Sequence, residues 1–262
     1  MSDVCAVLFS GGTDSLCAAA LACEKHSHVH LLTFYERATE NSTEPKTNVQ
    51  RLRDRYPNVK IEYSRISTDN FVQKLSYHEY FKSLVKFKFL NLATPGISSL
   101  SWHCAAIKYS KKNRIKIVYD GMTRELLHLP GHMPEIRSLF ISLYGEYGIS
   151  FSSPVIDWQV PPDQRFIDRL IIDRHGFTLT AKPNERTTGQ WLYEKKILPH
   201  PNVKGSLFDQ RMQHDCYPFV VYNMLVFWIY QPLYGFEKYK LMLGEFFSYK
   251  INLAKEIILN AE

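Results

Sequence analysis

The sequence predicts an α/β protein in which a parallel sheet carries helices on both faces, followed by a mainly helical C-terminal extension. Residues 4–9 form a short apolar run, typical of a strand buried on both faces. A glycine turn follows, and residues 13–25 are rich in Ala and Leu, which favours a helix. Residues 29–35 are a second apolar run. Strand, helix and strand at this spacing form a right-handed unit with parallel strands.

The later residues continue this alternation of strands and helices. Residues 60–66 alternate apolar and polar side chains, as a strand at the edge of a sheet does. A long helix is expected to begin at Thr68 and Asp69 and to extend toward Leu92, where the Thr94-Pro95-Gly96 sequence breaks it. Further helices are expected at residues 47–56, 98–112, 134–147 and 163–175, and further strands at residues 115–119 and 149–157.

Length and composition indicate a globular protein with one large domain, or one domain and an extension. The 262 residues are 45% hydrophobic and 22% charged, which is ordinary for such proteins. We place the boundary after residue 176, which gives an N-terminal α/β domain of residues 1–176 and a helical region of residues 177–262. The net charge of +6 permits a nucleic-acid or polyphosphate partner without requiring one.

The cysteines and the first residues set expectations about the compartment. The chain has 5 cysteines, an odd number without a C-x-x-C pair, so we expect free thiols and no structural zinc. The first residues lack the basic segment of a secretion signal, and residues 4–9 are too short for its apolar core. We therefore expect a cytoplasmic protein that does not associate with a membrane.

The turn between the first strand and the first helix is suited to bind an anion. Residues 10–15 (SGGTDS) place two glycines where the backbone must turn tightly and approach a ligand. The N–H groups and the positive dipole end of the helix that begins at Thr13 converge on the same point. Ser10, Thr13 and Ser15 add hydroxyl donors, so phosphate is the expected anion.

The residues of this turn exclude two other phosphate-binding motifs. The turn has no lysine and so is not a G-x-x-x-x-G-K-[ST] loop, and it lacks the spacing of G-x-G-x-x-G. Instead, SGGTDS resembles the S-G-G-x-D-S signature of the PP-loop ATP pyrophosphatases, which have a Rossmann-like fold. In that superfamily the loop holds the β,γ-pyrophosphate of ATP, and attack on the α-phosphate gives an adenylated substrate. The resemblance covers residues 4–176 and is specific only in residues 10–15.

This resemblance implies roles for individual residues. Asp14 and Ser15 are the catalytic candidates. A carboxylate beside phosphate is repulsive unless a cation intervenes, so we assign Asp14 to Mg²⁺, bound directly or through water. The residues expected to bind ATP are Ser10, Gly11, Gly12, Thr13, Ser15, Thr33, Phe34, Tyr35 and Gly121.

Two parts of this expected ATP site have alternative interpretations. Thr33, Phe34 and Tyr35 end the second strand beside the turn, where open α/β sheets bind ligands. They could hold the adenine, or Phe34 and Tyr35 could belong to the core and its rim. Gly121 follows the strand at residues 115–119, where it could let the backbone approach the ribose or α-phosphate, or act only as a turn glycine.

The sequence leaves the adenylated substrate open between a small molecule and a nucleobase. The chain is distantly similar in size and element order to the 7-cyano-7-deazaguanine synthases. It lacks the zinc-binding cysteine cluster of that family, because only Cys216 lies in the C-terminal third. Another branch thiolates tRNA bases through a cysteine, for which Cys104 beside His103 and Lys108 is the candidate. The alternative for Cys104 is a buried core thiol.

Two further alternatives concern partners and turnover. A nucleotide sensor of the same fold would bind ATP without turnover. Residues 216–234 are apolar and aromatic but contain Pro218, Asn223 and Pro232, which favours a buried helix, within the monomer or at a homodimer interface, over a membrane span. The basic residues that could follow an RNA backbone are Lys108, Lys111, Lys112, Arg114 and Lys116.

Overall fold

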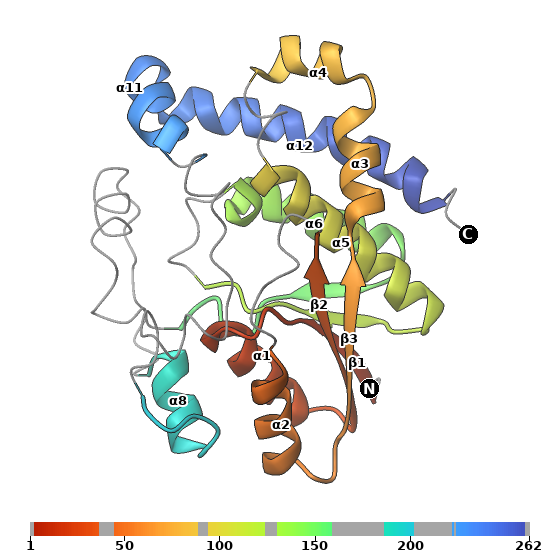
Figure 1. The fold of residues 1–262 in the computed structure, drawn as a ribbon, viewed down its shortest axis with the longest axis vertical. Helices are drawn as coiled ribbons and strands as arrows, with labels where there is room; N and C mark the ends of the chain where they lie inside the picture. Colours follow the sequence, from red (N-terminus) through yellow and green to blue (C-terminus); the bar gives the residue numbers. More distant parts are fainter. Residues whose placement is uncertain are drawn as a thin grey trace.

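The chain folds around a five-stranded sheet in which every strand pair is parallel (Figure 1). The computed structural model describes residues 3–36, 45–88, 94–123, 130–158, 186–201, 222 and 224–259. The strands are β1 (Val4–Leu8), β2 (His28–Tyr35), β3 (Lys60–Ser67), β4 (Ile117–Tyr119) and β5 (Ser150–Ser152). Their order in the sheet is β3-β2-β1-β4-β5. The predicted α/β class is therefore confirmed, and β3 is an edge strand as expected.

The central strand β1 is the point where the chain changes direction across the sheet. From β1 the chain moves outward through β2 to β3, and then returns to β4 on the other side of β1. Leu8 pairs with Leu32 of β2, and Val7 pairs with Tyr119 of β4. The carboxyl ends of β1 and β4 therefore flank the topological switch point, which is where open α/β sheets bind ligands.

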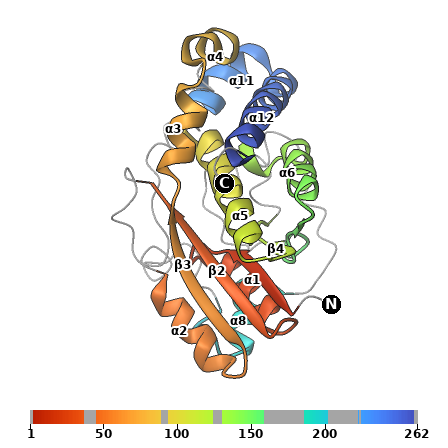
Figure 2. The ribbon, with the colours of Figure 1, turned by 90° about the vertical axis from the view of Figure 1, so that its right-hand side faces the viewer.

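Helices cover both faces of the sheet. The helices are α1 (Thr13–Cys23), α2 (Lys46–Arg55), α3 (Asp69–Tyr77), α4 (Tyr80–Phe87), α5 (Thr94–Lys112), α6 (Pro134–Glu146), α8 (Thr188–Glu194), α11 (Gln231–Tyr234) and α12 (Phe236–Leu259), with a 3₁₀ turn η4 (Pro130–His132) and a π-helical turn η5 (Leu225–Tyr230). On one face lie α1 and α2, with α8 packed on α1. On the other face lie α5 and α6, and α12 packs outside them beside α3 (Figure 2).

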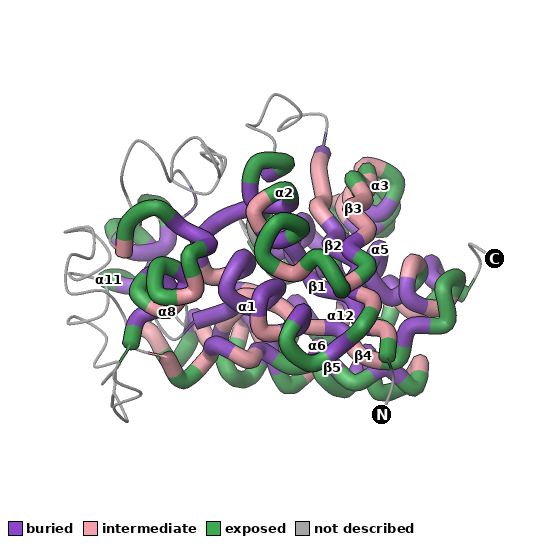
Figure 3. The backbone as a smooth tube through the Cα atoms, turned by 90° about the horizontal axis from the view of Figure 1, so that it is seen from below, coloured by how far each residue is buried: buried purple, intermediate pink, exposed green. Residues whose placement is uncertain are grey.

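Each face of the sheet has its own hydrophobic core. Ala6 and Leu32 point into the cluster shared with α5, α6 and α12. Val7 and Leu31 point into the opposite cluster, which the alanines of α1 fill. The buried stretches gather along β1 and α1, whereas α2 presents exposed residues to solvent (Figure 3). Burial on both faces explains why β1 reads as an unbroken apolar run.

The single long helix expected after Thr68 is wrong, because two helices, α3 and α4, stand there. The break follows Tyr77, and Glu79 adopts a left-handed conformation with φ of 47°. The ammonium of Lys250, which is buried on α12, donates to the carbonyl oxygen of Leu75 at 2.7 Å. In a continuous helix that oxygen would accept from the N–H of residue 79. A contact from the far end of the chain therefore accompanies the break, which explains why local sequence does not reveal it.

Two other boundaries also need correction. Helix α5 begins at Thr94, so Pro95 lies in its first turn and starts the helix, where its missing N–H has no intrahelical role. The last strand, β5, contains only Ser150–Ser152 and ends before Pro154, which cannot donate to a ladder. The predicted helix at residues 163–175 lies outside the described residues.

The C-terminal region is helical in the part that the structure describes. Helix α12 buries Phe246 and Phe247 in the same cluster as α5 and α6. In η5 and α11, by contrast, Trp228 is 71% exposed and Leu233 is 69% exposed. Val226, Phe227 and Tyr230 of η5 are buried, so the described part of the expected helix buries one face within the monomer and exposes the other. Burial of the exposed face at a homodimer interface stays a prediction, and residues 216–221 and 223 lie outside the described residues. Among the described helices, none has the length and apolar character needed to cross a membrane.

Candidate functional site

The SGGTDS turn lies between β1 and α1, at the switch point of the sheet. Gly11 has a φ of +89°, a conformation that side chains disfavour and that explains why glycine stands here. Gly12 is the N-cap of α1 in an extended conformation, and Thr13 begins the helix. The first N–H groups of an α-helix lack intrahelical acceptors and carry the positive end of the helix dipole. The turn therefore has the geometry expected of an anion-binding helix start.

The two serines of the turn hold its shape through their hydroxyls. Ser15 Oγ donates to the carbonyl oxygen of Gly12 at 2.9 Å and lies 3.1 Å from Ser10 Oγ. The N–H of Gly12 donates to Ser10 Oγ at 3.3 Å. Ser15 is buried, whereas Ser10 is exposed. Ser10 is thus the more accessible of the two hydroxyls, and Ser15 fixes the backbone of the turn.

Asn48 of α2 supports the turn from the side. Its Nδ2 donates to the carbonyl oxygen of Gly11 at 2.7 Å, and its side chain is fully buried. Arg51 Nη1 donates to Asn48 Oδ1 at 2.6 Å, which orients the amide. The hydrogen bond to Gly11 holds the one residue of the turn that has a positive φ. The sequence analysis did not find Asn48, because nothing local distinguishes it from a polar helix residue.

Gly121 lies against the start of α1, a contact that the sequence analysis did not predict. A Cβ atom at position 121 would lie 2.4 Å from both the N and the Cα of Ser15. Backbone therefore meets backbone here, and no side chain fits between them. Close approach of the two segments brings the end of β4 against the SGGTDS turn. Any contact of Gly121 with a nucleotide stays a prediction.

Asp14 faces a residue that lies far away in the sequence. Its Oδ1 accepts a hydrogen bond from Thr188 Oγ1 of α8 at 2.6 Å. Thr187 and Gln190 form a capping box at the start of α8, which fixes the position of Thr188. Asp14 is only partly buried, stands in the first turn of α1, and has one oxygen oriented by α8. The sequence analysis missed Thr188 because it follows the region that resembles the superfamily.

The residues at the carboxyl end of β2 point in different directions. Thr33 Oγ1 donates to the carbonyl oxygen of Phe9 at 2.5 Å and therefore lies next to the turn. Phe34 packs against the core on the opposite face of the sheet. The Tyr35 ring lies under the guanidinium of Arg65, with 4.9 Å between Cζ and the ring centroid. Thr33 is therefore placed with the turn, whereas the core interpretation suits Phe34 better.

An acidic group that the sequence analysis did not single out lies at the carboxyl ends of β4 and β5. Arg137 Nη1 donates to Asp120 Oδ2 at 3.0 Å, and Ser153 Oγ donates to Asp120 Oδ1. Burial raises the pKa of Asp120, although the Arg137 charge acts in the opposite direction. The carboxyl immediately before Gly121 is therefore held in a fixed position beside the switch point.

A second carboxyl group follows β2, on the same side of the sheet, where the parallel strands end. Glu36 is buried, and burial raises its pKa, while a hydrogen bond with Ser98 lowers it and the charge of Asp69 raises it further. Ser98 belongs to the first turns of α5. The carboxyl edge of the sheet thus carries acidic groups on both sides of the SGGTDS turn.

Cys104 has the surroundings of a core thiol. It is fully buried, and burial raises the pKa of its thiol far above the ordinary value. A nucleophilic cysteine needs the opposite shift and access to solvent. The adjacent His103 is enclosed by Phe140 and Phe151, and burial lowers its pKa to about 3. The structure therefore favours the core alternative for Cys104 over the thiolation alternative.

The basic residues considered for RNA lie on the side of the sheet where the strands begin, opposite the side that holds the SGGTDS turn. Lys108 and Lys112 lie in the C-terminal half of α5, and Arg114 follows its end, shortly before β4. All three are exposed. Because α5 runs opposite to the strands, these residues face away from the carboxyl edge that holds the SGGTDS turn. This basic group and the candidate anion site are therefore separate surfaces.

Comparisons with known proteins give weak matches. No protein-family model matches the chain. No curated protein matches it either.

Solved structures match part of the chain, among them the following two. The NMN synthetase of Francisella tularensis matches with 14% identity and a TM-score of 0.39, over 66% of this chain and 61% of that one. A predicted tRNA methyltransferase subunit of Methanocaldococcus jannaschii matches with 19% identity and a TM-score of 0.40, over 66% of this chain and 88% of that one. Both likenesses are too low to transfer a function, so the function has to be inferred from the residues of this chain.

Proposed function

We propose that this protein is an ATP-dependent enzyme of the PP-loop superfamily, which adenylates a substrate oxygen and releases pyrophosphate. The observation that carries this proposal is the SGGTDS turn at the topological switch point of a parallel sheet. The match to the S-G-G-x-D-S signature occurs in the strand-turn-helix setting that the signature requires. A left-handed Gly11 and a helix start at Thr13 give that turn the shape of an anion cradle.

The chain's own residues can perform the steps that adenylation requires. The N–H groups at the start of α1 and the hydroxyl of Ser10 bind the β- and γ-phosphates and stabilise the leaving pyrophosphate. Asn48 and Ser15 keep the turn in its binding shape before the nucleotide arrives. Thr33 marks the side of the turn on which the nucleoside extends, along the end of β2. The α-phosphate is then presented toward the end of β4, where a substrate oxygen can attack in line.

Mg²⁺ fits this site through Asp14. The carboxylate stands in the first turn of α1, and its Oδ1 accepts a hydrogen bond from Thr188 Oγ1. Magnesium in nucleotide sites is commonly held by one or two carboxylates together with substrate phosphates and water. When bound, the ion would neutralise negative charge on the phosphates. Thr188 keeps the carboxylate in the orientation that this role needs.

The substrate class we propose is a small molecule or a free nucleobase. The basic residues near the end of α5 face the edge of the sheet opposite the SGGTDS turn, so they do not direct an RNA toward it. Both amidation and thiolation of a nucleobase begin with an adenylated oxygen and are compatible with this proposal. The exposed apolar residues of η5 and α11 make a homodimer a further proposal.

A pair of glycine variants tests nucleotide binding. Gly11 and Gly235 have φ values of +89° and +83°, so Gly11→Ala and Gly235→Ala introduce the same kind of backbone strain, roughly 1–2 kcal/mol. Nothing lies within 4 Å of a Cβ at Gly235, which makes it a matched control away from the turn. Titration with a non-hydrolysable ATP analogue and Mg²⁺ is expected to lose at least tenfold in affinity for Gly11→Ala only. Equal affinities in the two variants would contradict the proposed site.

Product analysis tests the reaction. The purified protein, incubated with ATP and fractions of cell extract, is expected to yield AMP and pyrophosphate. The Asp14→Asn variant is expected to lose this Mg²⁺-dependent turnover. Formation of ADP and phosphate would refute adenylation while leaving ATP binding intact. Tight ATP binding without turnover in any fraction would instead identify a nucleotide sensor.

A further inference from the structure

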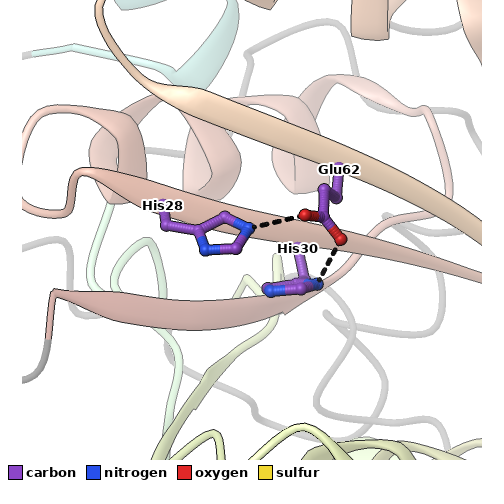
Figure 4. A group of neighbouring side chains, drawn as sticks. All are labelled: His28, His30 and Glu62. Carbon is purple, nitrogen blue, oxygen red and sulfur yellow. Dashed lines mark hydrogen bonds and ion pairs between the residues drawn. The ribbon is translucent and has the colours of Figure 1, made fainter.

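Two histidines and a glutamate form a cluster on the α5 side of the sheet, far from the SGGTDS turn. His28 and His30 stand two residues apart on β2 and therefore point to the same face. Glu62 of β3 is the register partner of His30. Figure 4 shows both imidazole rings directed at the two oxygens of the Glu62 carboxylate. Among the described residues, this is the group whose donor atoms all lie within 4.8 Å of one another.

Two donor distances in the cluster are close to those of a tetrahedral metal site. His28 Nε2 lies 3.1 Å from Glu62 Oε1, and His30 Nδ1 lies 3.5 Å from Glu62 Oε2. Zinc bonds to imidazole nitrogen and carboxylate oxygen of about 2.0–2.1 Å place neighbouring donors of a tetrahedron about 3.3 Å apart. Two imidazoles and one carboxylate are also a donor set that zinc and related divalent ions use in proteins. The two histidine-to-carboxylate distances are therefore already close to those around a bound ion, and the donor atoms of all three side chains lie within 4.8 Å of one another.

The surroundings of the cluster support a bound ion. Tyr109 of α5 places its hydroxyl 3.0 Å from His30 Nδ1 and 3.4 Å from Ser64 Oγ, so the inner wall of the site is polar, and this hydroxyl has to turn away from Nδ1 when that nitrogen binds an ion. His30 is buried, whereas the Glu62 side chain is 41% exposed, which leaves access from solvent on the Glu62 side. Burial and the neighbouring His28 lower the pKa of His30, whereas the charge of Glu62 raises it.

One cation already competes for the carboxylate. Lys60 Nζ lies 2.5 Å from Glu62 Oε1, and its side chain is 65% exposed. An ion at the cluster would repel this ammonium, which is free to turn into solvent. Lys60 therefore gives the cluster a property that distinguishes metal binding from a purely structural set of hydrogen bonds. Removal of its charge should favour the metal and should weaken the ion-pair arrangement.

We propose that His28, His30 and Glu62 bind one divalent transition-metal ion of the zinc type. The ion would link β2 to β3 under α5. Its position near the amino ends of these strands separates it from the candidate nucleotide site at their carboxyl ends. The ion would therefore hold the edge strand β3 to β2, with water or a solvent anion as its fourth ligand. This inference is independent of the proposed ATP chemistry.

Zinc titration of the full chain tests the proposal. Protein freed of metal by chelator treatment is titrated with ZnCl₂ in competition with a chromophoric chelator, and with CoCl₂ to read visible absorption. Wild type is expected to bind one equivalent with the absorption of a four-coordinate ion. His28→Gln and Glu62→Gln, both at partly exposed positions, are expected to bind at least about 100-fold more weakly. His78→Gln, at an exposed histidine outside the cluster, is the matched control and should bind like wild type.

Two further readouts make the test decisive. Lys60→Met is expected to tighten zinc binding several-fold, and zinc is expected to raise the thermal midpoint of wild type but not of Glu62→Gln. Unfolding curves without metal confirm that each variant is folded. Zinc binding that is absent, or that is equal in Glu62→Gln and His78→Gln, would overturn the proposal. Weaker binding by Lys60→Met would also contradict it.

Discussion

The sheet carries opposite kinds of polar group at its carboxyl edge, where the parallel strands end, and at its amino edge, where they begin. At the carboxyl edge, glycines, hydroxyls and main-chain N–H groups surround the SGGTDS turn, and Asn48 holds it through a backbone carbonyl. At the amino edge, the ionisable side chains of His28, His30 and Glu62 converge without help from the backbone. The first arrangement suits an anion and the second a cation. One sheet thus offers two candidate sites, and their expected selectivity follows from whether backbone or side-chain atoms supply the contacts.

This difference predicts how each edge responds to mutation. A site built from backbone depends on close approach and on conformation, so small added groups should disrupt it. A site built from side chains depends on the identity of its donors, so it should tolerate changes of backbone packing elsewhere. Helix α5 reaches both edges, through Ser98 at one and Tyr109 at the other.

Gly121→Ala should have the largest effect and should affect only the carboxyl edge. The added Cβ would lie 2.4 Å from the backbone of Ser15, which cannot move as a side chain can. We expect a loss of about 3 kcal/mol in the free energy of unfolding, measured in urea, and loss of ATP binding. Zinc affinity of the folded fraction should be unchanged.

Gly145→Ala is the matched control for this substitution. Nothing lies within 4 Å of a Cβ at position 145, near the end of α6. We expect this variant to be as stable as wild type or about 0.5–1 kcal/mol more stable, because alanine favours the helix. A Gly121→Ala protein that bound ATP normally would show that the close contact has no part in the site.

Asn48→Ala should have the next largest effect. The substitution removes the buried donor to Gly11 and the acceptor of Arg51 together. We expect a loss of about 2 kcal/mol in stability and a weaker affinity for ATP, measured by urea unfolding and calorimetric titration. Gln50→Ala, on the exposed side of the same helix, should stay within about 0.5 kcal/mol of wild type. Equal losses in the two variants would mean that the Gly11 contact does not stabilise the turn.

Acidification should lower the stability of the fold at both edges together, because His103 lies in α5, the helix that reaches both. Burial lowers the pKa of His103 to about 3 from 6.5, and the charges of Arg137 and His132 act in the same direction. Below pH 6.5 the His103 ring therefore binds a proton in the unfolded chain but stays neutral in the folded chain. The contribution of the neutral ring to the free energy of unfolding is complete above pH 6.5 and is lost as the pH falls toward 3. Stability should fall by up to about 1.4 kcal/mol per pH unit in this window.

A His103→Gln variant isolates this contribution. Urea unfolding of chelator-treated protein between pH 7 and pH 5 should show a shallower pH dependence for the variant than for wild type. The Tyr144 hydroxyl, which lies 3.2 Å from His103 Nδ1, is the polar neighbour that the glutamine amide can still reach. Identical slopes for the two proteins would show that His103 does not control the acid response.

The sequence predicts the parts of this molecule that local pattern encodes. The first strand, the glycine turn and the first helix are correct because burial, left-handed backbone and helix start all act within a few residues. Asn48 and Thr188 are missed because their partners, Gly11 and Asp14, are chosen by the fold. The break between α3 and α4 is missed for the same reason, since Lys250 of α12 takes up the Leu75 carbonyl.

The amino-edge cluster stands between these cases. The alternation of His28 and His30 is visible in the sequence and places both rings on one face of a strand. Their partner, Glu62, is supplied by the register of β3 against β2. The expectation of no structural zinc considered only cysteines, and a search for histidines at strand spacing would have raised the cluster as a candidate.

Thr188→Val should have the smallest effect and tests whether α8 belongs to the carboxyl-edge site. Valine keeps the shape of threonine and removes the hydroxyl that donates to Asp14 at 2.6 Å. We expect a loss of about 1 kcal/mol in stability and a few-fold weaker binding of ATP with Mg²⁺, without any change in zinc affinity. Thr188→Ser retains the hydroxyl and should restore ATP binding. If valine and serine behave alike, α8 only packs on α1, and the orientation of Asp14 does not depend on it.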